Sequence, residues 1–225
     1  MAVSKQDTAV AAGIALLLLA GGKKVLASTG PKAAAPPKPV DPKADGDALI
    51  KRANQKAALA WASIFADHPV TPLVAGELAR WAGIESSGNP LAKSRLNERG
   101  LMQAGAQTVD EGGLTQAEWD ALIDPKTTKK QHADLAIKYV DWLASHAATH
   151  LLSDPADPVD RVWYAKLYHQ RPVDVRDVVG PLTKQLSTTN AHTIATVLAN
   201  TWSADPKAMH RLRAANVVAW GTATP

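Results

Sequence analysis

The chain has 225 residues, of which 46% are hydrophobic, and it carries a formal net charge of +4. That length is sufficient for one well-packed core with material left for a tail or an anchor. The absence of cysteine excludes a disulfide framework and a thiolate metal site. The mild positive charge, without a dense cluster of Lys and Arg interleaved with aromatic residues, does not single out nucleic acid as a partner.

The N-terminal residues contain an uncharged apolar run. It extends over residues 9–22, is centred on residues 14–19, and ends at Lys23 and Lys24. A full membrane span needs roughly 20 apolar residues, so this run is short, and its length also suits the core of a signal peptide. Because the lysine pair follows the apolar run instead of preceding it, we predict that residues 1–27 form an uncleaved hydrophobic membrane anchor, with a signal as the alternative.

Residues 28–46 are rich in Pro, Ala and Lys, with Gly-Pro, Pro-Pro, Lys-Pro and Asp-Pro pairs. Proline lacks the backbone N–H and fixes φ, so this composition predicts a semi-extended linker and not a packed element. A domain is expected to begin at residue 47.

Apolar side chains recur at helical spacing from residue 47 onward. The pattern predicts a helix within residues 47–67 with Asp45 or Asp47 as its N-cap, and a second helix that Thr71 and Pro72 begin and Glu85 ends. The sequence after residue 114 predicts four further features: a capping box at residues 115–118, a long helix beginning at residues 124–125, and helices near residues 158–169 and 181–202. No run of alternating polarity predicts strands, so the fold class is mainly α.

The last segment, residues 205–225, follows the predicted domain of residues 47–204. It carries five apolar residues that favour packing onto that domain: Met209, Leu212, Val217, Val218 and Trp220.

One stretch concentrates the candidate chemistry. Residues 85–103 read ESSGNPLAKSRLNERGLMQ, so a carboxylate follows directly on a Trp-containing helical pattern, and a turn cluster and a short apolar island come next. Four apolar residues would surround Glu85, namely Trp81, Ile84, Leu101 and Met102. A carboxylic acid in partly apolar surroundings is held protonated near neutral pH, which suits the delivery of a proton to a glycosidic oxygen.

This stretch resembles the motif of the lytic transglycosylase family that has the soluble-transglycosylase (SLT), lysozyme-like domain. The family pattern of Glu-Ser, Asn-Pro-x-Ala-x-Ser and Gly-Leu-Met-Gln recurs at residues 85–86, 89–94 and 100–103 with every gap preserved. Downstream, Thr108 and the Ile-Asp-Pro of residues 123–125 also match. The resemblance covers about residues 72–168 and implies a mainly α, lysozyme-like transglycosylase domain.

The chain departs from the family pattern at several positions. Asn97 replaces a glycine, and since Asn tolerates positive φ better than most residues, the turn is expected to survive. The Tyr-Asn-Ala-Gly segment of the family is missing as such. Its nearest counterpart places Tyr168 at the Tyr and His169 at the Asn, with Tyr164 as the rival for the tyrosine.

The resemblance implies a reaction and a set of site residues. Glu85 would be the catalytic acid and then the base, cleaving the MurNAc-GlcNAc β-1,4 bond of peptidoglycan and forming 1,6-anhydro-muramoyl products without water. Four residues would contact the substrate or the catalytic centre: Ser94, Met102, Gln103 and Tyr168. Neither a metal nor another cofactor is expected.

Two alternatives remain open from the sequence. A hydrolase of the same bond needs a second carboxylate, and Glu98, Asp110 and Glu111 are nearby in sequence, although each is interpreted as a solvated charge. A catalytically inactive structural protein of a virion or secretion apparatus could instead bind glycan. The expected partners are peptidoglycan glycan strands, a membrane through residues 1–27, and other virion or envelope proteins. The expected location is membrane-anchored and facing the periplasm and cell wall, or in a phage virion.

Overall fold

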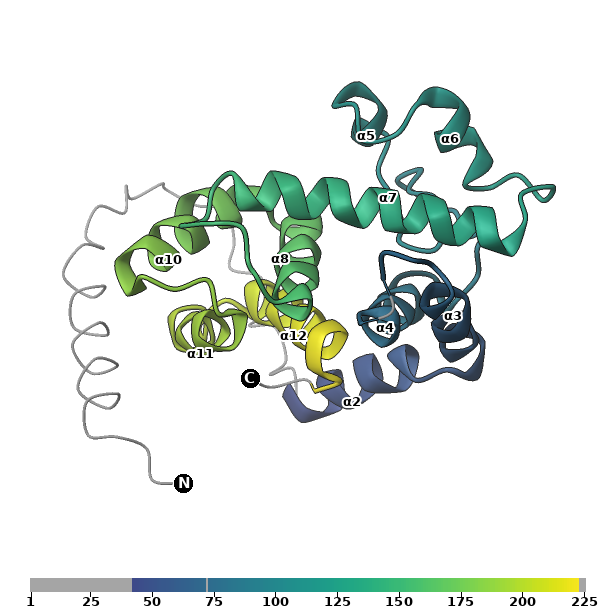
Figure 1. Cartoon of the computed structure of the whole chain (residues 1–225). Coiled ribbons are helices and arrows are strands. Elements are labelled where there is room, and N and C mark those ends of the chain that lie inside the picture. The colour runs from purple at the N-terminus through teal and green to yellow at the C-terminus, as the bar shows by residue number, and fades with distance from the viewer. Residues whose placement is uncertain (1–41, 72, 223–225) are drawn as a thin grey trace, which may run out of the picture. The chain divides into compact units, whose positions relative to one another are not determined.

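A computed structural model describes residues 42–71 and 73–222 of the chain (Figure 1). The predicted anchor and most of the predicted linker lie outside these residues. The described part is helical, as predicted, and contains isolated bridges but no strand. Its helices are α2 (Pro42–Ala53), α3 (Lys56–Ala66), α4 (Ala75–Ser86), α5 (Gln107–Asp110), α6 (Gln116–Ala121), α7 (Lys129–Ala148), α8 (Pro158–Gln170), α9 (Pro172–Asp174), η1 (Val175–Val179), α10 (Gly180–Leu186), α11 (Ala191–Thr201) and α12 (Pro206–Trp220). Across residues 42–71 and 73–222, none of the helices has the length and apolar character needed to cross a membrane.

The N-terminal helices begin at other residues than the sequence predicts. The segment 47–67 divides into α2 and α3, and α2 already begins at Pro42, so Asp45 and Asp47 lie inside the helix and neither is an N-cap. Thr71 does not cap α4, because its hydroxyl donates to the carbonyl of Phe65 at 2.8 Å. The predicted boundary was wrong because this threonine stabilises the preceding turn instead.

Capping boxes determine where α6 and α7 begin. The box of Thr115 and Glu118 at the start of α6 is confirmed. Helix α7 begins at Lys129, where Thr128 and Gln131 form a second box, and not at residues 124–125 as predicted. Each box satisfies two N–H groups that a helix end otherwise leaves without partners. The segment 181–202, where at least one helix was expected, holds α10 and α11.

Helix α7 lies across the domain in Figure 1 and is about 30 Å long at 1.5 Å per residue. It packs along α8 and against α3, and α3 packs closely on α4. The first core lies between these helices and the loop that follows α4. Its larger members are Trp61, Phe65, Trp81, Leu101 and Tyr139.

Helix α8 separates this core from a second one. Val162 and Ala165 face the first core, whereas Trp163 and Leu167 belong to the second, with residues of α10, α11 and α12. The helix is therefore buried on nearly all sides. Helix α12 packs on α8 and α4, and Trp163 donates to the Oδ1 atom of Asn216 at 2.9 Å. The predicted packing of the C-terminal segment is thus confirmed.

Candidate active site

The chain turns sharply directly after Glu85. Helix α4 ends at Ser86, and Ser87 and Gly88 follow with φ of 54° and 74°. A Cβ atom at Gly88 would lie 2.8 Å from the backbone of Ala58, so only glycine fits this close approach. Trp61 donates from Nε1 to the carbonyl of Gly88 at 2.9 Å. These contacts hold the end of α4 firmly against α3.

The loop of residues 89–104 is held in shape by its own polar groups. Asn97 has a φ of 63°, which confirms that the turn survives without the family glycine. The Ser94 hydroxyl oxygen accepts from the backbone N–H of Leu96 at 3.2 Å and of Glu98 at 3.1 Å. The Gln103 amide donates to the carbonyls of Ala92 at 3.2 Å and Gly100 at 2.9 Å.

Three of the predicted substrate contacts therefore have roles within the protein. Ser94 and Gln103 stabilise the loop, and the side chain of Met102 is buried in the first core. Their contact with substrate stays a prediction.

Glu85 forms an ion pair with Lys166, which lies in the middle of α8. The Lys166 Nζ donates to the Oε1 atom of Glu85. The Lys166 side chain is completely buried, and 19% of the Glu85 side chain is exposed. The ammonium also lies 4.8 Å from the centre of the Trp81 ring, within the range of a cation–π contact. Sequence reasoning missed this lysine.

The ion pair changes the expected electrostatics of Glu85. Burial raises the pKa of this carboxyl, but the charges of Lys166 and His169 act in the other direction, and the pKa ends below its ordinary value of 4.5. The prediction of a carboxyl held protonated by apolar surroundings was therefore wrong for the unliganded protein. Burial in turn lowers the pKa of Lys166 below 10.5, although Glu85 favours its charged form.

His169 and Tyr139 continue the polar cluster. The Nε2 atom of His169 lies 3.9 Å from Oε1 of Glu85, and Nδ1 lies 2.8 Å from the Tyr139 hydroxyl. Burial, and then the charge of Lys166, lower the pKa of His169 to about 4, so the imidazole is neutral at pH 7. A neutral ring has one N–H, and both contacts are satisfied when Tyr139 donates to Nδ1 and Nε2–H faces Glu85.

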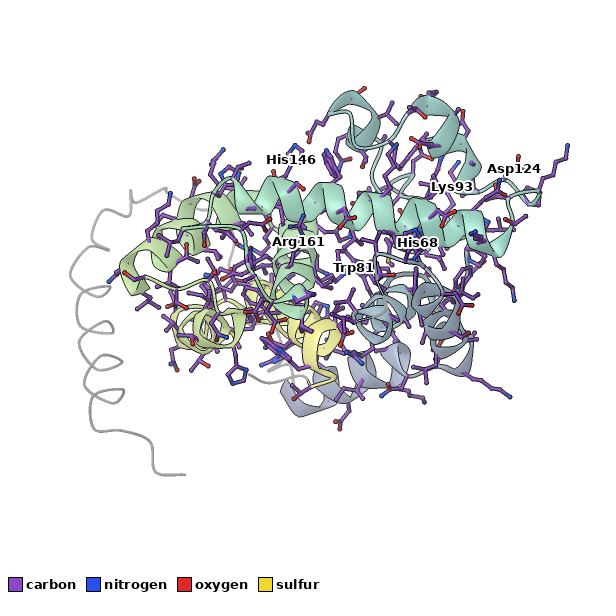
Figure 2. All side chains as sticks on the ribbon, viewed as in Figure 1. His68, Trp81, Lys93, Asp124, His146 and Arg161 are labelled. Atoms are coloured by element: carbon purple, nitrogen blue, oxygen red, sulfur yellow. The ribbon has the colours of Figure 1, made fainter. Side chains whose placement is uncertain are left out.

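The tyrosine of this cluster is Tyr139 on α7. Burial and the charge of Glu85 raise its pKa above the ordinary value of 10. Tyr168 instead packs against the rings of His146 and His150, at centroid distances of 6.4 and 6.1 Å. His146 and Trp81, both labelled in Figure 2, are joined by a row of rings that runs through His169, Tyr139 and Trp142. The rival Tyr164 is buried against Trp163 at 4.8 Å.

Glu98 is the further carboxylate that acts on this cluster. It is half-buried, and its charge influences both Lys166 and Tyr139. Asp110 and Glu111 are exposed. Within residues 42–71 and 73–222, no group of three His, Asp or Glu side chains is arranged to hold a metal ion.

This mainly α domain, with a half-buried glutamate at the end of α4, fits the lysozyme-like class. The family model described as Transglycosylase SLT domain matches residues 74–164, and this part of the chain belongs to that family. Family membership supports a peptidoglycan-cleaving function of the transglycosylase type and binding to glycan strands. The match ends before Lys166 and His169. No curated protein and no solved structure matches the chain.

Proposed function

We propose that this protein is a lytic transglycosylase that cleaves the MurNAc-GlcNAc β-1,4 bond of peptidoglycan with Glu85 as acid and base. The observation that carries the proposal is the position of Glu85 within the matched domain. Its carboxylate lies at the end of α4, paired with Lys166 and 3.9 Å from Nε2 of His169, yet part of its side chain reaches the surface. A carboxyl of this kind can transfer a proton in surroundings that contain little water.

The reaction needs one proton and two bond changes. Glu85 protonates the glycosidic oxygen as the bond from that oxygen to C1 breaks, and the N-acetyl group of the substrate helps to stabilise the positive centre. The ionised Glu85 then takes the proton of the C6 hydroxyl, and O6 bonds to C1. The product is a 1,6-anhydro-muramoyl end, and water is not consumed.

The substrate contacts in this proposal follow the family motif. Ser94 and Gln103 shape the loop beside Glu85, and Met102 packs beneath it. Tyr168, with the neighbouring imidazoles of His146 and His150, would lie along a more distant part of the glycan. The protein would be held at the envelope membrane or in a virion by residues 1–27, facing the cell wall.

The experiment is mass spectrometry of the muropeptides that the full chain releases from purified peptidoglycan. Glu85→Gln is the test variant, and Glu118→Gln, at a half-buried carboxylate on α6, is the matched control. We expect anhydro-muropeptides from the wild type and from the control. Release by Glu85→Gln should fall by at least about 100-fold, the usual contribution of a general acid.

Two other results would point to other functions. Reducing-end products that disappear in Glu85→Gln would indicate a hydrolase, with Glu98 as the second carboxylate to test. The ion pair of Glu85 with Lys166 favours a second candidate, a domain that binds glycan without cleaving it, because it opposes protonation of the acid. Binding of glycan by folded wild-type protein, with no release of products, would support that candidate.

A further inference from the structure

Lys166 is an unusual residue for its position. It lies in the middle of a buried helix, its neighbours Ala165 and Leu167 are fully buried, and the lysine side chain itself has no exposed surface. Burying an ammonium group is costly unless a partner compensates for the lost water. An apolar residue would fill the same space without that cost. The charge is therefore placed next to Glu85 at the expense of stability.

We propose that Lys166 is a positioning residue that holds the proton which Glu85 delivers to the leaving oxygen. The inference rests on the proposed function. In the unliganded protein the proton resides on the lysine, and the two groups form a neutral pair overall. The transfer of one proton along the existing hydrogen bond from Nζ to Oε1 converts this pair into a carboxylic acid and an amine.

The groups around Lys166 act on such a transfer in both directions. Burial is the largest influence and favours the neutral amine, whereas the Trp81 ring, 4.8 Å from the ammonium, favours the charged form. The charge of Arg211 acts against the ammonium form, whereas Glu98 favours it weakly, as the last of the influences on this lysine. The titratable and charged groups that face the pair are His169 on α8, Tyr139 on α7, Arg211 on α12 and Glu98 in the loop after α4.

Over the whole reaction the pair neither gains nor loses a proton. The proton of Lys166 passes to Glu85 and from there to the glycosidic oxygen, which leaves with it as a hydroxyl. The C6 hydroxyl then gives its proton to Glu85, and this proton returns to the Lys166 amine. The pair ends in the state in which it began, without water or a metal ion.

Substrate binding would be the trigger for the first transfer. The exposed part of the pair is the 19% of the Glu85 side chain that reaches solvent. A glycan that covers this surface removes the remaining water, and two separated charges then become less favourable than two neutral groups. The acid would therefore form when a bond is in place to be cleaved.

The test is the pH dependence of anhydro-muropeptide release by the wild type and by Lys166→Met. The fully deprotonated pair can take up its first proton at either of two groups, whereas the variant has only the carboxyl. The pair therefore keeps its last proton to a higher pH than the lone carboxyl does. We expect release by the wild type to be independent of pH until the pair loses its last proton, whereas release by Lys166→Met should fall by about tenfold for each pH unit above the pKa of Glu85 in that variant.

Lys166→Arg separates charge from proton supply. Arginine keeps the positive charge beside Glu85 but does not give up its proton. We expect Lys166→Arg to lose at least about 100-fold in release at neutral pH, although Lys166→Met retains part of it. Circular dichroism and thermal melting establish whether each variant folds. If Lys166→Arg does not fold, the pH profile of Lys166→Met tests the inference by itself.

Three outcomes would overturn the inference in different ways. Lys166→Met could remain active to a higher pH than the wild type, which would make the lysine a suppressor of the acid. Identical pH profiles would make Lys166 purely structural. Both results leave the proposed function intact, because product is still released. No release by folded wild-type protein at any pH would overturn the proposed function, and this assignment with it.

Discussion

Two lysine–glutamate pairs in this protein differ in burial and not in chemistry. Lys138 on α7 donates to both carboxylate oxygens of Glu118 on α6 at 2.7 Å, with 47% and 30% of the two side chains exposed. Lys166 donates to one oxygen of Glu85 and has no exposed surface. The exposed pair has the more complete hydrogen bonding, but water screens its charges and solvates either partner alone.

The comparison shows that burial, and not the number of hydrogen bonds, determines how strongly the two charges of a pair depend on each other. The pKa of Glu118 is lowered first of all by the hydrogen bond from Lys138. For Glu85 and Lys166 the largest influence on each group is its own burial, and each depends on the other to remain charged. A pair of this kind adds little net stability, but the loss of one partner leaves a buried charge without compensation.

The largest effect on stability is expected from Lys166→Met at pH 8. The ionised Glu85 would then lie in its enclosed position without a cation, and breaking a buried pair typically costs about 3–5 kcal/mol. Urea denaturation at pH 8 and at pH 5 measures this loss, which should be smaller at the lower pH because Glu85 takes up a proton. A loss below about 1 kcal/mol at pH 8 would mean that water reaches this pair as it does the exposed one.

His169 should make the stability of this region depend on pH. The folded protein holds the imidazole neutral with a pKa of about 4, against 6.5 in the unfolded chain, so its contribution is complete above pH 6.5 and is lost as the pH falls to 4. The shift corresponds to about 3 kcal/mol. Denaturant titrations of the wild type and His169→Asn between pH 7 and 4 measure the difference in slope. Equal slopes would contradict a buried neutral histidine.

Tyr139 should matter more to the site than Tyr168. Tyr139→Phe leaves Nδ1 of the buried His169 without its partner, which costs about 1–2 kcal/mol. Tyr168 is half-buried against two imidazoles, and Tyr168→Phe keeps that packing. Thermal melting and muropeptide release by the two variants make the comparison. A larger loss of release in Tyr168→Phe would restore the role that the family resemblance gives to that residue.

Local signals in the sequence predicted much of this fold. The period of apolar residues and the turn residues after Glu85 predicted a mainly α domain and the end of α4. Asn97 was expected to adopt positive φ and does so. Helix starts were less predictable, because Thr71 and Thr128 are equally good caps in sequence. Tertiary contacts decide between such candidates, since Thr71 donates to Phe65 instead.

The electrostatics of the site could not be predicted in the same way. Glu85 and Lys166 are separated by 81 residues, and nothing local in the sequence indicates that they meet. One signal was available, because Lys166 interrupts an apolar run at a position that α8 must bury on all sides. An ionisable residue at such a position implies a partner. The sequence alone does not identify which carboxylate on another helix provides it.

The smallest effect on stability is expected at the exposed pair of Lys138 and Glu118. Lys138→Met should cost no more than about 0.5–1 kcal/mol, although the two hydrogen bonds that it removes are short and well formed. Glu118 also accepts from the backbone N–H of Thr115 in the capping box of α6, so it keeps a partner in the variant. Denaturation at low and high salt should show that the small loss shrinks further as salt screens the charges. A loss as large as that of Lys166→Met would mean that the α6–α7 contact, and not burial, governs the strength of such pairs in this domain.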